Sequence, residues 1–204
     1  MTLLPLTSSL VHGALLFGLA ALTSAAPART GFVFTIDQRY GSIGFSVNHL
    51  GLFSSHGRFD RFSGTLALDP DRPERTRFSM SIDAASLDMP WTLGATMLRG
   101  PNFFDVAAYP IITYASRSVV ARDAQHYAID GVLQVRGMER PQVLDAVLLN
   151  RQVDRDHHVE TAEFEITGHL KRSDFGMVAQ PLFISDEVTL TIQVRIELPH
   201  PAAG

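Results

Sequence analysis

The stretch Val188-Thr189-Leu190-Thr191-Ile192-Gln193-Val194-Arg195-Ile196-Glu197 alternates large apolar residues with polar ones along its whole length. Side chains of a β-strand point alternately to opposite faces, so this period of two separates an apolar face from a polar one. The same alternation recurs over residues 32–36, 78–83 and 162–167. The pattern is typical of antiparallel strands with one buried and one solvated face.

Weaker strand signals lie between these segments, at residues 43–48, 62–68, 111–120, 126–135 and 143–150. Turn-forming residues separate most of them, at 69–71, 122–123, 137–141 and 154–156. About eight or nine short strands at this spacing indicate an all-β sandwich or barrel. An eight-stranded barrel is just wide enough to be filled by side chains or to hold one small ligand.

One long segment, residues 84–110, interrupts the strand pattern. It is rich in proline and glycine, and we expect a short helical segment around residues 88–106. Pro101 can occupy the first turn of a helix, and Tyr109-Pro110 ends the helical option. A bulky Phe103-Phe104 pair on a short helix that leads into a strand indicates a plug or lid on a barrel with an apolar interior.

The chain has 204 residues, no cysteine and a formal net charge of −4. This length favours one domain plus a leader. Without cysteine the protein can form no disulfide, no thiolate metal site and no catalytic thiol. A mildly acidic chain lacks the basic footprint of a nucleic-acid-binding protein, so we expect no nucleic-acid partner.

Residues 1–25 are predicted to be a signal peptide, with an apolar run from Leu10 to Leu22 and small residues up to Ala25. The alternative is a retained membrane anchor, but the apolar run is shorter than the ~20 residues of a spanning helix. We therefore expect a periplasmic or secreted protein with no stable membrane span after leader removal. Residues 26–31 are predicted to be a linker and residues 199–204 a flexible tail.

Several blocks of sequence, in a fixed order, resemble the YceI-like domain family. They include Ser42-Ile43-Gly44-Phe45-Ser46-Val47-Asn48-His49-Leu50-Gly51, Leu98-Arg99-Gly100-Pro101-Asn102-Phe103-Phe104-Asp105, Gly131-Val132-Leu133-Gln134-Val135-Arg136-Gly137, Gly168-His169-Leu170-Lys171-Arg172-Ser173-Asp174-Phe175-Gly176-Met177 and Asp186-Glu187-Val188-Thr189-Leu190. The resemblance spans residues 32–198. It implies an exported, antiparallel, lipocalin-like extended β-barrel that binds a polyisoprenoid or another long-chain amphiphile, often as a homodimer.

The chain departs from the family pattern at residues 93–97, Leu-Gly-Ala-Thr-Met. The family usually carries a polar Arg-Asp-x-His-type patch there. If those polar groups contact a ligand head group, this protein has lost the contact.

The large, soft residues of the apolar faces are the predicted lipid-binding residues, although a phenylalanine on a strand more often packs in a core. We expect about half of the phenylalanines and methionines among them to line a cavity. The set comprises Phe45, Val47, Phe59, Phe62, Met80, Ile82, Met97, Leu98, Phe103, Phe104, Ile112, Tyr114, Leu133, Val135, Phe164, Ile166, Phe175 and Met177.

Four polar residues of the family blocks are candidates for contact with a lipid head group: His49, Arg99, Asn102 and Arg172. An arginine fork can bind a phosphate or a carboxylate. The alternative for the arginines is an internal ion pair, for example with Asp105 or Asp174, because buried arginines usually have protein partners. The alternative for His49 is that it satisfies carbonyls of a turn.

No metal or catalytic pattern emerges from the remaining polar residues. Seven of the eight histidines lie beyond residue 25, and none has the spacing of a known zinc motif. The chain has no Gly-x-Ser-x-Gly element. We expect no metal, no cofactor and no enzymatic activity.

The predicted function is binding and carriage or storage of a long-chain apolar lipid, an isoprenoid quinone or a polyprenyl species, inside the barrel in the periplasm. One alternative is a stress protein that binds a fatty acid or fatty amide. Others are an enzyme or enzyme accessory that acts on such a lipid, and a filled-barrel interaction protein with no lipid ligand.

Overall fold

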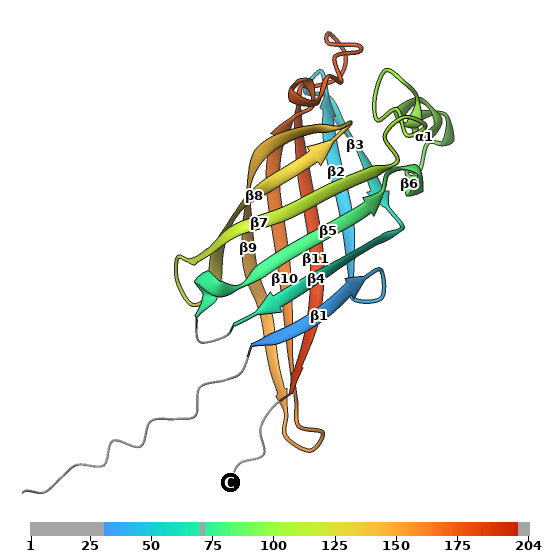
Figure 1. Cartoon of the computed structure of the whole chain (residues 1–204). Helices are drawn as coiled ribbons and strands as arrows, with labels where there is room; N and C mark the ends of the chain where they lie inside the picture. The colour runs from blue at the N-terminus through green and yellow to red at the C-terminus, as the bar shows by residue number, and fades with distance from the viewer. Residues whose placement is uncertain (1–30, 70–71, 200–204) are drawn as a thin grey trace, which may run out of the picture.

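The computed structural model describes residues 31–69 and 72–199, which form one antiparallel sheet of eleven strands and one α-helix (Figure 1). The predicted leader, most of the linker, the turn residues 70–71 and residues 200–204 lie outside the described residues. The strands are β1 (Phe32–Asp37), β2 (Gly41–His49), β3 (Phe53–Phe59), β4 (Phe62–Leu68), β5 (Arg77–Asp83), β6 (Leu87–Asp88), β7 (Ile111–Ala121), β8 (His126–Val135), β9 (Met138–Asp154), β10 (Val159–Lys171) and β11 (Glu187–Pro199).

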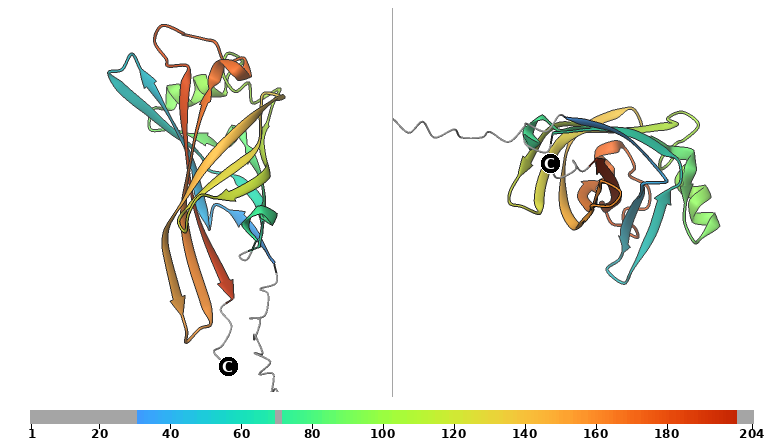
Figure 2. Two further views of the ribbon diagram at one scale, coloured as in Figure 1. Left: turned by 90° about the vertical axis from the view of Figure 1, so that its left-hand side faces the viewer. Right: turned by 90° about the horizontal axis from the view of Figure 1, so that it is seen from below.

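The strands follow the order β1-β4-β5-β7-β8-β9-β10-β11-β2-β3-β6 across the sheet, and every pairing is antiparallel. The sheet curls around a single interior, with β1 and β6 at its two edges (Figure 2). The strands β9, β10 and β11 extend beyond the others at one end (Figure 1). The prediction of an antiparallel, lipocalin-like β fold is confirmed.

The sheet has eleven strands where about eight or nine were expected, because two of them, β3 and β6, give no alternation signal. Strand β3 reads Phe-Ser-Ser-His-Gly-Arg-Phe, and only its last residue, Phe59, is buried. It is held by its ladder with β2, and at its end by two-residue β6. Main-chain pairing, rather than an apolar face, places both strands in the sheet.

The turn expected at residues 137–141 is shorter than predicted, and Pro141 lies inside β9. The β8–β9 connection consists of Arg136 and Gly137, both with positive φ (51° and 71°), as in tight hairpin turns. Pro141 pairs with Val132 on β8, while β10 joins β9 only from Asp145 onward. A proline is tolerated there because that edge of β9 has no ladder partner.

The helix α1 covers Thr92–Arg99 and is shorter than the expected segment. The expectation that Pro101 starts a helix carrying Phe103-Phe104 is wrong: α1 ends at Arg99, with Gly100 as its C-cap, and both phenylalanines lie in the turns that follow. The amide of Phe104 donates back to the Leu98 carbonyl at 2.9 Å. These returning hydrogen bonds fold the segment against the end of the helix. Within residues 31–69 and 72–199, no helix has the length and apolar character to cross a bilayer.

The apolar side chains of the sheet point inward and form one large cluster, with a smaller one near β1, β10 and β11. Three short 3₁₀ helices, η1 (Pro73–Arg75), η2 (Ala84–Ser86) and η3 (Arg172–Phe175), lie at the ends of strands. Two segments close the end of the interior nearest α1: residues 100–108 and the loop from η3 to β11 (Figure 1). We call these two segments the lid.

Candidate functional site

A cavity of about 120 Å³ lies inside the curled sheet, between the lid and the middle of the strands. Its wall is apolar except for Tyr114, Gln142 and Arg172. Most of the predicted lipid-binding residues line it, namely Phe45, Val47, Phe59, Met80, Ile82, Leu98, Phe103, Phe104, Ile112, Tyr114, Leu133, Val135, Phe175 and Met177. The structure brings them together from five strands, the helix and the lid.

Four predicted residues lie elsewhere. Phe164 and Ile166 line a second cavity of about 150 Å³ further along the interior. Phe62 and Met97 line neither of these cavities: Phe62 is buried in the main cluster, and Met97 lies half-buried on α1. Contact of any of these residues with a lipid stays a prediction.

The cavity wall also includes residues that were not among the predicted site residues. They are Ile43, Phe78, Gln142, Leu144, Leu170, Ile184, Val188, Leu190 and Ile192. Phe78, Val188, Leu190 and Ile192 belong to the alternating faces quoted above. These four residues alternate with polar residues on their strands, and Phe78 lies on the same face as the predicted site residues Met80 and Ile82. The alternation alone was therefore enough to find them.

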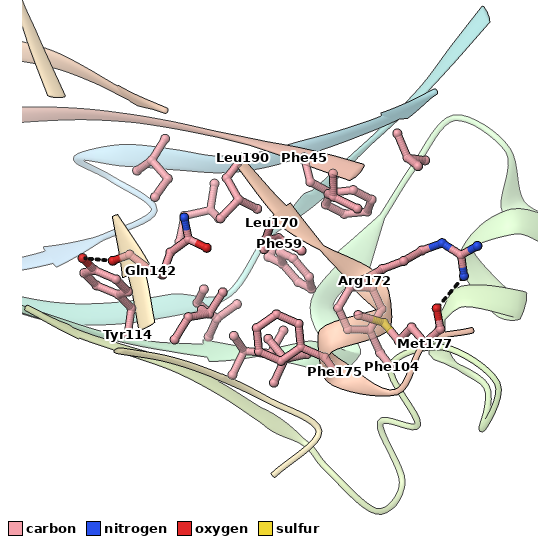
Figure 3. Close-up of a pocket in the computed structure, with 18 of the residues that line it drawn as sticks. Phe45, Phe59, Phe104, Tyr114, Gln142, Leu170, Arg172, Phe175, Met177 and Leu190 are labelled. Carbon is pink, nitrogen blue, oxygen red and sulfur yellow. Dashed lines mark hydrogen bonds between the residues drawn. The ribbon is translucent and has the colours of Figure 1, made fainter. Parts of the chain in front are cut away.

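Three phenylalanines meet at the edge of the cavity nearest α1 (Figure 3). Phe104 reaches in from the lid, and its ring lies 5.6 Å from Phe59 and 6.3 Å from Phe45, edge-on in both cases. Gly57 leaves room for the Phe45 ring, because a Cβ there would lie 2.4 Å from Phe45 Cζ. These contacts place Phe104 between solvent and the interior.

The lid is tied to the sheet by Arg136, from the β8–β9 turn. Its Nη1 donates to the Phe103 carbonyl at 2.6 Å and lies 3.4 Å from the Gly176 carbonyl. One side chain therefore contacts both segments of the lid. Phe103 and Phe175, which both line the cavity, are only 3% and 1% exposed, so these two rings shield this end of the cavity from solvent.

Arg172, a head-group candidate, is buried and points along the lid rather than into the cavity (Figure 3). Its guanidinium donates to four carbonyls of the loop that follows η3: Met177, Ala179 (2.8 Å), Ile184 (3.0 Å) and Ser185 (3.0 Å). Burial lowers the pKa of Arg172, and the carboxylate of Asp186 opposes this effect. An arginine still stays protonated. The guanidinium thus has carbonyl partners instead of the expected Asp174.

The other head-group candidates lie outside the cavity wall. Arg99 donates to the carbonyls of Ala85 (3.2 Å) and Leu87, and among the described residues no ion pair joins it to Asp105. Asn102 is exposed in the turn after α1. His49 stacks on Phe53 at 4.7 Å, and its buried Nε2 has no hydrogen-bond partner in the described part of the chain. A role of these residues toward a head group stays a prediction.

Tyr114 and Gln142 mark the opposite end of the cavity (Figure 3). The Tyr114 hydroxyl donates to the Ile129 carbonyl at 3.1 Å and lies 3.4 Å from the Gln142 carbonyl. Burial raises the pKa of Tyr114 well above its usual range, and the charge of Asp130 acts in the same direction, so the hydroxyl stays a donor. The Gln142 amide donates to the carbonyls of Val143 (2.7 Å) and His169 (3.1 Å).

Exposed apolar side chains gather at the lid end of the molecule. The β2–β3 turn, the loop before β11 and α1 carry them, and hydrogen bonds from Ser185 to Asn48 (2.9 Å) and from Gln180 to Met97 (3.8 Å) join these three elements. We call the group the apolar rim; it comprises Leu50, Leu52, Phe53, Trp91, Leu93, Val178, Leu182 and Phe183. Leu93 belongs to the stretch where the family's polar patch is missing, so this position adds an apolar group instead.

Across residues 31–69 and 72–199, no three His, Asp or Glu side chains converge as a metal site would require. The histidines of the polar turns bind neighbouring carboxylates: His126 lies 2.8 Å from Asp123, and His157 lies 2.8 Å from Asp154. The polar groups on the cavity wall are engaged with main-chain carbonyls. The arrangement suits enclosure of an apolar molecule.

The model of the YceI-like domain family matches residues 34–196. Protein YceI of Escherichia coli O6:H1 is 31% identical over 178 residues, which cover 86% of this chain and 92% of that protein. UPF0312 protein plu2095 of Photorhabdus laumondii is 29% identical over 194 residues, 95% of each chain.

Solved structures show the same fold. BcnA of Burkholderia cenocepacia superposes with a TM-score of 0.70 at 20% identity, over 79% of this chain and 99% of BcnA. The Campylobacter jejuni YceI protein gives 0.65 at 25% identity, over 75% and 90%. A polyisoprenoid-binding domain from Saccharophagus degradans, implicated in plant cell wall breakdown, gives 0.56 at 13% identity, over 82% and 98%.

Proposed function

This chain belongs to the YceI-like domain family, and from that premise we propose that it binds a long-chain apolar lipid, an isoprenoid quinone or a polyprenyl species, in the cavity beneath its lid. The observation that carries the proposal is the composition of the cavity wall. The curled sheet encloses a space that is lined almost wholly by apolar side chains. A solved structure of the same fold is described as a polyisoprenoid-binding domain.

The driving force is transfer of the tail out of water. Burial contributes roughly 25 cal/mol per Å² of apolar surface, so a tail that buries several hundred Å² gains several kcal/mol. Part of this free energy is spent in ordering a flexible chain. Because the polar groups of the wall already bind carbonyls, affinity comes from the tail rather than from a charged head group.

The cavity must widen to accept such a tail. At about 120 Å³ it is close to the size of a cavity that admits benzene, roughly 150 Å³. The side chains best suited to move are Met80 and Met177, which have flexible thioethers, and Phe104, which is only half-buried. We propose that the tail enters past Phe104 and displaces these side chains.

Carriage between membranes, in the periplasm, is the proposed role. The apolar rim lies on the lid and on the elements beside it, at the end of the molecule where the cavity has its aromatic edge. An apolar group of this kind can insert its side chains into the surface of a bilayer. The rim would then bring the lid against the membrane that supplies the lipid.

The test is to express the full chain in a bacterium, purify the exported form and analyse its organic extract by mass spectrometry. The expected result is a long-chain isoprenoid or acyl species in stoichiometric amount. Phe104→Arg should abolish the co-purified lipid, because the charge would enter the aromatic edge of the cavity. Leu149→Arg is the control, since Leu149 is 58% exposed, lies outside the apolar rim and lines neither cavity. An empty extract from folded protein that also takes up no added quinone would contradict the proposal.

A further inference from the structure

The interior holds two apolar cavities stacked along the strands. The second, of about 150 Å³, begins where the first one ends. On β9, Leu144 lines the first cavity and the next inward-facing residue, Ala146, lines the second. On β11, Ile192 lines the first cavity and Val194 lines the second. Phe78 lines both cavities, so its ring lies at the boundary between them.

Three side chains form this boundary, and we call them the septum: Phe78, Tyr114 and Leu144. The rings of Phe78 and Tyr114 are 6.0 Å apart. Two interior glycines leave space for the other septum side chains. A Cβ at Gly131 would lie 2.5 Å from Tyr114 Cζ, and a Cβ at Gly168 would lie 2.5 Å from Leu144 Cδ2. The septum therefore fills the cross-section of the interior where these small residues make room.

The members of the septum differ in how firmly they are held. Tyr114 is fixed by its hydroxyl, which donates to the Ile129 carbonyl across the sheet. The ring of Phe78 makes no hydrogen bond and has a cavity on either side. An apolar ring between two voids can turn without leaving a polar group unpaired. Phe78 is therefore the part of the septum that a ligand can move.

We propose that Phe78 sets the longest apolar tail that the protein accepts. A tail that enters beneath the lid fills the first cavity and stops at the septum, and only displacement of the Phe78 ring opens the second cavity to its distal end. The inference rests on the proposed function, because it assigns the length selectivity of the same lipid site.

The experiment measures binding of farnesol, geranylgeraniol and solanesol, three prenyl alcohols of increasing length, to purified wild-type protein and to Phe78→Ala. The ratio of solanesol to farnesol affinity should rise on the order of tenfold in Phe78→Ala, because the joined cavities bury more of the longer tail. Phe78→Leu should give a smaller rise, and it carries the test if Phe78→Ala does not fold. Phe34→Ala is the matched control, because Phe34 packs against the smaller apolar cluster and lines neither cavity.

An unchanged affinity ratio in a folded Phe78 variant would overturn the role of Phe78, and so would an equal rise in Phe34→Ala. If the wild-type protein binds none of the alcohols, the proposed function fails. The septum is then tested by crystal structures of both proteins under xenon pressure, in which the positions of bound xenon atoms mark the apolar cavities. Separate groups of xenon sites in the wild type and a continuous row in the Phe78 variant support the septum. A continuous row in the wild type, or separate groups in both proteins, overturns it.

Discussion

Arg172 shows how a buried cation can serve the fold rather than a ligand. Its guanidinium gathers the carbonyls of Met177, Ala179, Ile184 and Ser185, which belong to a loop with no ladder of its own. Four main-chain acceptors depend on this one side chain. A buried carbonyl without a donor costs free energy, so the loop needs the arginine to stay folded over the cavity.

Replacement of Arg172 by methionine should therefore lower the free energy of unfolding by roughly 3 kcal/mol, because several buried carbonyls lose a charged donor. Urea titration followed by circular dichroism measures this change. Arg195→Met is the control, since Arg195 is 54% exposed and makes only surface ion pairs with Glu163 and Glu197. Equal, small effects of both substitutions would show that Arg172 does not hold the loop, and its role toward a head group would be open again.

At the scale of the elements, one side chain joins the two segments of the lid to each other. Arg136 bridges its two segments through the carbonyls of Phe103 and Gly176. Neither segment is part of the sheet. If the proposed ligand leaves beneath the lid, the lid must part from the end of the sheet, and this bridge opposes that motion. The strength of the bridge should thus set the rate of exchange.

Arg136→Met should speed the release of a bound apolar fluorescent probe by on the order of tenfold, the factor that corresponds to loss of about one charged hydrogen bond. Stopped-flow displacement by excess unlabelled lipid measures the rate. Arg140→Met is the matched control, because Arg140 is exposed and its Nη1 donates to the neighbouring Glu139 carbonyl. If both variants release the probe at the wild-type rate, the bridge does not gate exchange.

The strands with an apolar face could be predicted from sequence, and those held by pairing alone could not. Alternation located β1, β5, β10 and β11, because burial on one face imposes a period of two. Strand β3 is mostly polar and was not predicted, because it is held in the sheet by its hydrogen-bonded pairing with β2 rather than by an apolar face. The helical segment was predicted to be longer than the helix at residues 92–99. The hydrogen bonds that fold residues 103–104 against the end of α1 cannot be recognised in the sequence.

The candidate site could be predicted by residue type but not by position along the interior. Phe164 and Phe45 both lie in strands expected from the sequence, yet they line different cavities because they lie at different heights in the sheet. The septum depends on the register that sets Gly131 beside Tyr114. The pairing register across several strands is set only when the whole sheet assembles, so no local sequence pattern predicts it.

At the scale of the whole molecule, the apolar rim and the cavity lie at the same end, while the far end of the long strands is polar at its tip, Asp154 to His157. Leu52 and Leu182 are the most exposed rim residues, at 80% and 78%. The two ends of the molecule therefore differ in surface character. The lid end presents apolar side chains that suit contact with a bilayer, and the opposite tip presents polar ones. A carrier needs such an orientation, because the lipid must leave the membrane beside the lid.

The double substitution Leu52→Ser with Leu182→Ser should slow uptake of a fluorescent prenyl probe from phosphatidylcholine vesicles by about tenfold. Each leucine gains roughly 1.5–3 kcal/mol on full burial, and partial insertion into a bilayer realises only part of that. Equilibrium binding of the probe from solution should stay the same, because neither residue lines the cavity. Leu149→Ser with Val153→Ser is the matched control, since both residues are exposed on β9 toward the far end. Uptake at the wild-type rate by the rim variant would mean that lipid reaches the cavity through the solvent, and the rim would need another partner to explain its exposure.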